Sequence, residues 1–168
     1  MEELSSKNEE ALTKIWVDLP NHWMMGGESF WAKPLGDNEY EIRNSPFGAY
    51  GLNFNDVVIA TAEDADKKSE IRSLVRRSGH STLRFYFPKD ISEDVQTDFL
   101  GKLNSLGASY EGMKEWHFAV DIPPEVNYNP IIALLEESEK CGLLFYETCE
   151  ARVEGSFDDV PDEDAEIE

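Results

Sequence analysis

The sequence predicts an α+β protein with two parts: an N-terminal small bent antiparallel sheet or half-barrel, followed by a ferredoxin-like βαββαβ unit. Two patterns support this prediction. The first half of the chain contains five short strand-like segments separated by turn residues, without a helical period. The second half alternates strand and helix patterns in the order βαββαβ. With 168 residues, the chain can bury a core without metals or disulfides.

Each strand of the first half is predicted from its own pattern. Ile15, Val17 and Leu19 alternate with Trp16 and Asp18, which is typical of a strand with one buried face. The turn residues Gly36-Asp37-Asn38 separate two apolar segments that are expected to form a hairpin. The five expected strands cover residues 13–19, 30–35, 39–43, 56–62 and 70–77.

The second half carries two helices with recognisable ends. Ser92 is the expected N-cap of the first helix and Gly107 ends it. Asn129 is the expected cap of the second helix, with Pro130 in its first position and Gly142 at its end. Apolar residues at steps of four, four and three form the buried face of the first helix: Val95, Phe99, Leu103 and Leu106. Strands are expected at residues 82–87, 108–112, 116–120 and 143–149.

The charge pattern divides the chain further. Residues 154–168 contain eight acids and no base, which predicts a disordered acidic tail. Residues 1–12 are expected to be an acidic, disordered leader. Between them lie the β subdomain, residues 13–80, and the ferredoxin-like subdomain, residues 81–153.

The net charge restricts the classes of function. With 35 acidic and 15 basic residues, the chain carries a net charge of −20. This charge argues against nucleic acid and anionic membranes as partners, and favours a basic protein. The first residues lack the basic start and apolar run of a secretory signal. The sequence therefore predicts a cytoplasmic protein with free thiols at Cys141 and Cys149, and no cofactor or metal site.

Five groups of residues recur in an order and spacing that carry a family resemblance. They are Phe30-Trp31-Ala32 with Tyr40, Ser45-Pro46-Phe47, Asn55-Asp56-Val57-Val58, Arg77-Ser78-Gly79-His80-Ser81-Thr82-Leu83-Arg84, and Asp121-Ile122-Pro123-Pro124 with Tyr128. Together they resemble a bacterial family named domain of unknown function 4265. The resemblance covers roughly residues 14–150 and rests on the order and spacing of segments rather than on one diagnostic motif. It implies a small bacterial cytoplasmic protein without an established reaction, and some relatives look like immunity proteins that accompany toxins.

One segment is strongly basic within this acidic chain. From Lys67 to Lys89, hereafter the basic stretch, there are seven bases and one acid. Its centre could bind phosphate through backbone N–H groups and guanidinium forks. Equally, the turn could be structural, with its arginines neutralising carboxylates of the chain. The residues of this candidate turn are Arg76, Arg77, Ser78, Gly79, His80, Ser81 and Arg84.

Carboxylates are expected on the outer surfaces of both helices. Such a surface either only solvates the protein or attracts a basic partner by electrostatic steering. Nuclease toxins fit as partners because their active sites attract phosphate. The acidic face consists of Asp94, Asp98, Glu136, Glu137 and Glu139.

Three functional hypotheses follow. The first is an acidic binding or inhibitor protein, most specifically an immunity protein that neutralises a nuclease-type toxin. The second is a regulator that binds nucleic acid or a phosphate ligand through the basic stretch. The third is a small enzyme with Arg77, His80 and His117 in a cleft, although the sequence contains no GxGxxG, Walker A, GxSxG or HExxH motif. The first hypothesis is preferred, so the chain is not expected to be an enzyme.

Overall fold

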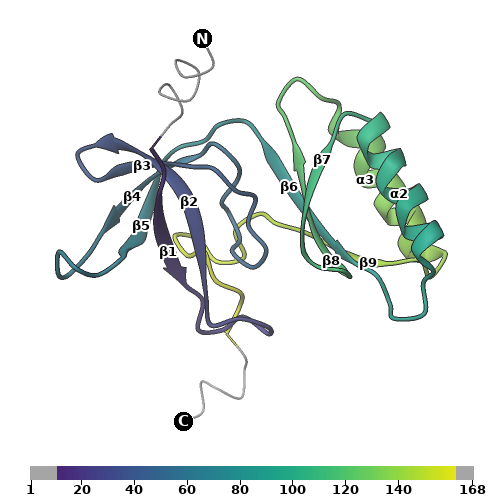
Figure 1. Ribbon diagram of the computed structural model, residues 1–168, viewed down its shortest axis with the longest axis horizontal. Helices are drawn as coiled ribbons and strands as arrows, with labels where there is room; N and C mark the ends of the chain where they lie inside the picture. The colour runs from purple at the N-terminus through teal and green to yellow at the C-terminus, as the bar shows by residue number, and fades with distance from the viewer. Residues whose placement is uncertain (1–10, 162–168) are drawn as a thin grey trace.

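The computed structural model describes residues 11–161. It contains two units, a five-stranded barrel and a four-stranded sheet with two helices (Figure 1). The helices cover the face of the sheet that points away from the barrel. The mixed α+β class predicted from the sequence is confirmed.

The barrel closes completely. Its order is β1-β2-β3-β4-β5, and all sequential neighbours are antiparallel. Closure comes from a parallel pairing of the first and last strands, in which Ile15 lies opposite Ser69. The predicted open, wholly antiparallel sheet or half-barrel is therefore corrected to a closed barrel with one parallel pair. Its strands are β1 (Thr13–Asp18), β2 (Gly27–Gly36), β3 (Glu39–Ile42), β4 (Val57–Thr61) and β5 (Ser69–Arg76).

Apolar residues from the barrel strands fill the interior. Ile15 and Val17 are buried, as their alternation along β1 predicts. Phe30 from β2 and Ile42 from β3 lie in the same core without solvent exposure. Closing a sheet on itself leaves no unpaired edge, so this small unit buries one continuous core.

The second unit follows the predicted βαββαβ order. Its sheet has the strand order β7-β8-β6-β9, and every neighbouring pair is antiparallel. The crossovers from β6 to β7 and from β8 to β9 each contain one helix. The elements are β6 (Ser81–Tyr86), α2 (Glu93–Ser105), β7 (Ser109–Lys114), β8 (His117–Ile122), α3 (Tyr128–Lys140) and β9 (Phe145–Thr148).

The ends of the helices show where side-chain chemistry sets the boundaries. Ser92 caps α2 as predicted, and its hydroxyl accepts a hydrogen bond from the N–H of Val95 at 3.3 Å. The cap of α3 is Asn127, whose side-chain oxygen accepts from the N–H of Asn129 at 3.2 Å. Asn129 therefore lies inside the helix, and the predicted start is corrected by two residues.

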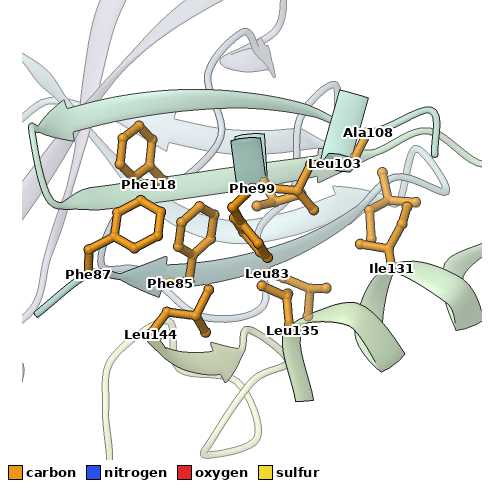
Figure 2. Close-up of a cluster of buried hydrophobic side chains, with 12 residues drawn as sticks. Leu83, Phe85, Phe87, Phe99, Leu103, Ala108, Phe118, Ile131, Leu135 and Leu144 are labelled. Carbon is orange, nitrogen blue, oxygen red and sulfur yellow. The ribbon is translucent and has the colours of Figure 1, made fainter. Parts of the chain in front are cut away.

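A core of aromatic and aliphatic residues joins the helices to the sheet (Figure 2). Phe85 of β6 stacks on Phe118 of β8 with ring centroids 5.2 Å apart. Phe99 of α2 meets Phe85 edge-on at 5.1 Å. Ile131 and Leu135 of α3 are fully buried in the same cluster. The inner face predicted for α2 is confirmed at Phe99 and Leu103, whereas Val95 and Leu106 are exposed.

The first part of the expected acidic tail packs on the barrel. Phe157 contacts the barrel core, and its carbonyl accepts a hydrogen bond from the N–H of Tyr50 at 2.9 Å. Asp158 is buried and accepts from the N–H of Asn21 at 2.8 Å. The prediction of a disordered tail is therefore wrong for residues 154–161, and residues 162–168 lie outside the described residues. Residues 1–10 of the leader predicted at residues 1–12 also lie outside them.

None of the helices in the described part of the chain is both long and apolar enough to cross a bilayer.

Candidate functional site

The two units meet at the loop between β3 and β4, residues 43–56. Glu28 of β2 accepts hydrogen bonds from three backbone N–H groups of this loop, those of Phe47, Gly48 and Ala49, at 2.5, 3.0 and 2.9 Å. Burial raises the pKa of the Glu28 carboxyl, while these N–H groups and the charge of Arg84 counteract that shift. Glu28 thus ties the loop to the barrel.

Arg84 of β6 holds the same loop from the side of the sheet. Its guanidinium donates to the carbonyl oxygens of Pro46, Gly48 and Ala49 at 3.2, 3.2 and 2.8 Å. Its Nε donates to the carboxylate of Glu147 at 2.9 Å, and only 1% of the residue is exposed. Arg84 is therefore a buried structural residue, and its predicted place in an anion-binding turn is wrong.

The predicted phosphate-binding turn is stabilised by internal hydrogen bonds. The N–H of Ser78 donates to Asp56 at 2.8 Å, and its hydroxyl donates to the carbonyl of Phe54 at 2.7 Å. The N–H of His80 donates to the hydroxyl of Ser78 at 3.1 Å. Gly79 has a φ of +95°, in the region that favours glycine. Because the N–H groups of Ser78 and His80 are already bonded, the predicted cradle of free N–H groups is not formed at these positions.

The basic stretch does not form one continuous surface. Lys67 makes exposed ion pairs with Glu63 and Asp64 in the turn after β4. Arg72 on β5 pairs with Glu70 of the same strand at 3.1 Å. The remaining bases are distributed over both units because β5 belongs to the barrel and β6 to the second sheet. A nucleic-acid strand would therefore meet separate lysine and arginine side chains rather than one continuous basic surface.

The candidate turn nevertheless borders a hollow between the two units. The imidazole Nδ1 of His80 lies 2.8 Å from a carboxylate oxygen of Asp121 on β8. Arg77 is exposed beside it, whereas the neighbouring Arg76 does not line the hollow. The hollow has a volume of about 490 Å³ and is lined by Gly51, Asn53, Arg77, His80, Ser81, Thr82, Tyr128, Cys149, Glu150 and Ala151.

The proposed enzyme cleft of Arg77, His80 and His117 does not form. Asp121, the partner of His80, is four residues from His117 on β8, which corresponds to roughly 13 Å along a strand. His117 is 2% exposed, and burial together with Arg84 lowers its pKa to about 4. His117 is therefore a neutral, buried residue near neutral pH and does not pair with His80 as acid and base.

Cys149 is the other reactive residue type near the hollow. Burial raises the pKa of its thiol to about 12, so the nucleophilic thiolate is scarce near neutral pH. Neither cysteine is in a disulfide, and Cys141 is exposed at the end of α3. Residues 11–161 contain no group of three or more His, Cys, Asp or Glu side chains placed to hold a metal ion.

The predicted acidic face lies on the outer surfaces of the two helices. Two of its carboxylates have local partners. Asp98 makes an exposed ion pair with Lys102 at 3.5 Å, and Glu139 accepts a hydrogen bond from the N–H of Tyr146 at 3.0 Å. The predicted residues Asp94, Asp98, Glu136, Glu137 and Glu139 are all exposed.

A row of aromatic residues lies at one end of the second sheet and was not predicted. Tyr86 at the end of β6 contacts Phe145 at the start of β9, with ring centroids 5.6 Å apart. Trp23, from the loop after β1, lies 6.1 Å from Tyr86, and Trp116 lies 6.3 Å from it. Trp23, Phe145 and Trp116 are 59%, 51% and 37% exposed. These four residues are named the aromatic row.

Two carboxylates lie near Tyr86 of the aromatic row, and the ammonium group of Lys114 lies 5.7 Å from the ring centre of Trp116. Burial is the main cause that raises the pKa of the Tyr86 hydroxyl, and the nearby charges of Glu147 and Glu139 raise it further. The negative charges of Glu147 and Glu139 therefore also favour a cation near the ring of Tyr86. Glu139 belongs to the predicted acidic face, so one carboxylate of this face lies near Tyr86 of the aromatic row.

Sequence reasoning missed the aromatic row because its members come from four separate segments. Tyr86 pairs in register with both His117 and Phe145, so the pairing of strands brings their side chains to one face. The one available signal was Trp23, an aromatic residue in the apolar loop Asn21-His22-Trp23-Met24-Met25.

Comparisons with known proteins identify a family and a shared fold. A family model described as "Domain of unknown function (DUF4265)" matches residues 28–146. The structure is similar to that titled "Novel crystal structure of a hypothetical protein from Neisseria gonorrhoeae", with a TM-score of 0.69 and 19% sequence identity. The alignment covers 85% of this chain and 97% of that chain, so it shows a common fold. No curated protein matches the chain.

Proposed function

The chain belongs to the DUF4265 family, and we propose that it is an acidic binding protein that docks a basic protein partner. In its most specific form, the proposal is an immunity protein that neutralises a nuclease-type bacterial toxin in the cytoplasm. The proposed activity is binding and requires no reaction or cofactor. One observation carries the proposal: an aromatic row with three exposed members lies beside the exposed carboxylate of Glu139 in a protein with a net charge of −20.

The aromatic row has the composition of an interface centre. Contiguous exposed apolar surface is uncommon on monomeric proteins, and Trp and Tyr are enriched among residues that dominate binding energy. Arginine and lysine also stack on aromatic faces. The chain uses this contact internally, since the guanidinium of Arg152 lies 4.4 Å from the ring centre of Tyr50. A basic partner could therefore place arginine or lysine side chains on the row.

The carboxylates provide the second part of the proposed interaction. Glu136 and Glu137 are exposed on α3, and Glu136 lies close enough to Tyr146 of β9 to raise the pKa of its hydroxyl. Charges around an interface accelerate encounter with a partner of opposite sign, and this acceleration weakens as salt increases. The acidic face thus accounts for the rate of association, and the aromatic row for the lifetime of the complex.

A fold class for the second unit is also part of the proposal. We assign the second unit to the ferredoxin-like class, because its sheet order β7-β8-β6-β9 and its two crossover helices follow the split βαβ arrangement. In that arrangement one face of the sheet is covered by helices, and here the other face meets the barrel loop through Arg84.

The first test is identification of the partner. The tagged full chain is used to capture proteins from its native host, and the purified candidate is then tested for binding and for nuclease activity. The immunity form of the proposal predicts that the captured protein is a basic nuclease and that the chain inhibits it stoichiometrically. A captured protein that is acidic, or that binds without any dependence on salt, would contradict the proposal.

The second test uses variants to separate the association rate from the lifetime of the complex. The double variant Glu136→Lys/Glu137→Lys should slow association about tenfold at low salt. The control is Glu63→Lys/Asp64→Lys, which makes the same charge change on the β4–β5 turn of the barrel. Glu139 is kept because its bond to the N–H of Tyr146 supports β9.

The aromatic row is tested by dissociation kinetics. Trp23→Ala and Phe145→Ala should each accelerate dissociation roughly tenfold or more, with little change in association. Trp31→Ala is the matched control, because Trp31 is 46% exposed but lies on the barrel beneath Lys14. Equal effects of the control and the row variants would show that the row is not the interface.

A further inference from the structure

The hollow between the barrel and the second unit has the size of a small-molecule site. Its volume of about 490 Å³ lies within the range of ligand pockets in proteins. It collects residues from the loop before β4, the β5–β6 connection, the start of α3 and the segment after β9. Segments far apart in the sequence therefore contribute to one concave surface.

Polar groups around this hollow are held in fixed positions. His80 is oriented by the 2.8 Å contact of its Nδ1 with Asp121, which leaves the imidazole Nε2 as the ring nitrogen available to a ligand. Thr82 donates its hydroxyl hydrogen to the side-chain oxygen of Asn53 at 2.7 Å. A site whose groups are already ordered loses less conformational entropy when a ligand binds.

Arg77 is the cation of this site. Its guanidinium makes no hydrogen bond or ion pair with any other residue in the range 11–161. By contrast, Arg72, Arg84 and Arg152 all donate hydrogen bonds within the protein. A guanidinium without a carboxylate partner, in a chain with a net charge of −20, keeps its planar set of donors available for an oxyanion.

We propose that this hollow binds a small oxyanion, a carboxylate or a phosphate, through the Arg77 guanidinium and, when the imidazole is doubly protonated, through the Nε2–H of His80. Glu150 also lines the hollow, and its negative charge repels an anion and lowers the affinity of the site. Removing this charge should therefore raise the affinity for the oxyanion. The site is distinct from the aromatic row, and the proposal does not depend on the identity of a protein partner.

The test is a titration of the full chain followed by two-dimensional amide NMR, with sodium phosphate, sodium acetate and sodium chloride at matched ionic strength. Phosphate or acetate should shift the amide signals of residues 77–82 and 149–151 in a saturable manner, and chloride should not. Saturation by phosphate alone assigns a phosphate-bearing ligand, and saturation by acetate alone assigns a carboxylate ligand. Either result supports the proposal.

Three variants make the test specific. Arg77→Gln should weaken binding about tenfold or more, whereas Arg76→Gln, its exposed neighbour outside the hollow, should change affinity less than about twofold. Glu150→Gln should tighten binding. The amide spectra show directly whether each variant is folded. Equal loss in the Arg76 and Arg77 variants, weaker binding in Glu150→Gln, or shifts that chloride reproduces would overturn the proposal.

Discussion

Arg84 shows how one buried charge can join two separate cores. A buried guanidinium is costly unless it is paired and its donors are bonded. Here Glu147 provides the opposite charge and accepts from Nε, and three carbonyl oxygens of the barrel loop accept three of the other four N–H donors. Tyr50 adds a cation–π contact at 4.7 Å. The residue that sequence analysis placed in a ligand site is thus explained by its position between the two units.

His117 should make the stability of the protein depend on pH. Its pKa is lowered from 6.5 to about 4, and its Nδ1 is buried without a hydrogen-bond partner in the described structure. Between these two values the unfolded chain binds a proton that the folded chain excludes. Stability from this residue is therefore present above pH 6.5 and lost as the pH falls toward 4, by about 2–3 kcal/mol at pH 4.5.

The measurement compares urea unfolding of the wild type and His117→Phe at pH 7.5 and pH 4.5. Phenylalanine preserves a ring against Trp116 and Phe47, which both contact His117. The wild type should lose more stability than the variant on acidification, and the difference isolates His117 from the buried carboxyls of Glu28 and Asp121. Parallel pH dependence in the two proteins would show that His117 does not titrate as stated.

At the scale of elements, local signals predicted the helices and strands well. Ser92 and the spacing of Phe99 and Leu103 identified α2 because caps and a 3.6-residue period depend only on nearby residues. The cap of α3 was misplaced from Asn127 to Asn129, since two asparagines precede Pro130 and Ile131 and either can cap. Composition misled at residues 154–161, where a high density of acids concealed the apolar anchor Phe157.

That anchor gives a prediction at the same scale. Phe157→Ala should lower the free energy of unfolding by about 1–2 kcal/mol, because the partly buried ring packs on the barrel core. The control is Val160→Ala, which changes a side chain that is 56% exposed and should stay within about 0.5 kcal/mol of the wild type. If chemical denaturation gives equal values for both variants, the segment does not stabilise the barrel.

At the scale of the whole molecule, contacts between distant segments escaped prediction. Closure of the barrel depends on the pairing of β1 with β5, in which Trp16 lies opposite Glu70, and no local pattern encodes that pairing. The predicted pairing of His80 with His117 was wrong for the same reason. His80 and His117 are both near strand ends, but the register of β6 with β8 places His80 beside Asp121 instead. The acidic residues on the helices are exposed as expected, because they lie outside the apolar face of each helix.

The two units should unfold together, because the loop between β3 and β4 belongs to both. Within residues 11–161 both helices, α2 and α3, belong to the second unit, so the helical circular dichroism of these residues reports that unit. In a Trp116→Phe background, fluorescence reports the barrel unit through Trp16, Trp23 and Trp31. When Arg84 is unchanged, the two signals should give the same urea midpoint, as expected for a single cooperative transition.

Replacing Arg84 should separate these two transitions. Arg84→Met in the same background leaves three loop carbonyls without their donor and removes one partner of Glu147, which keeps Tyr50 and Arg152. This change should cost about 3–5 kcal/mol and weaken the connection between the units. The fluorescence and dichroism midpoints should then differ. Arg72→Met is the control, because it breaks an exposed ion pair with Glu70 and exposed hydrogen bonds to Thr61, all within the barrel, and should leave both midpoints together. If Arg84→Met shifts both signals by the same amount, Arg84 stabilises the protein without being the link between its units.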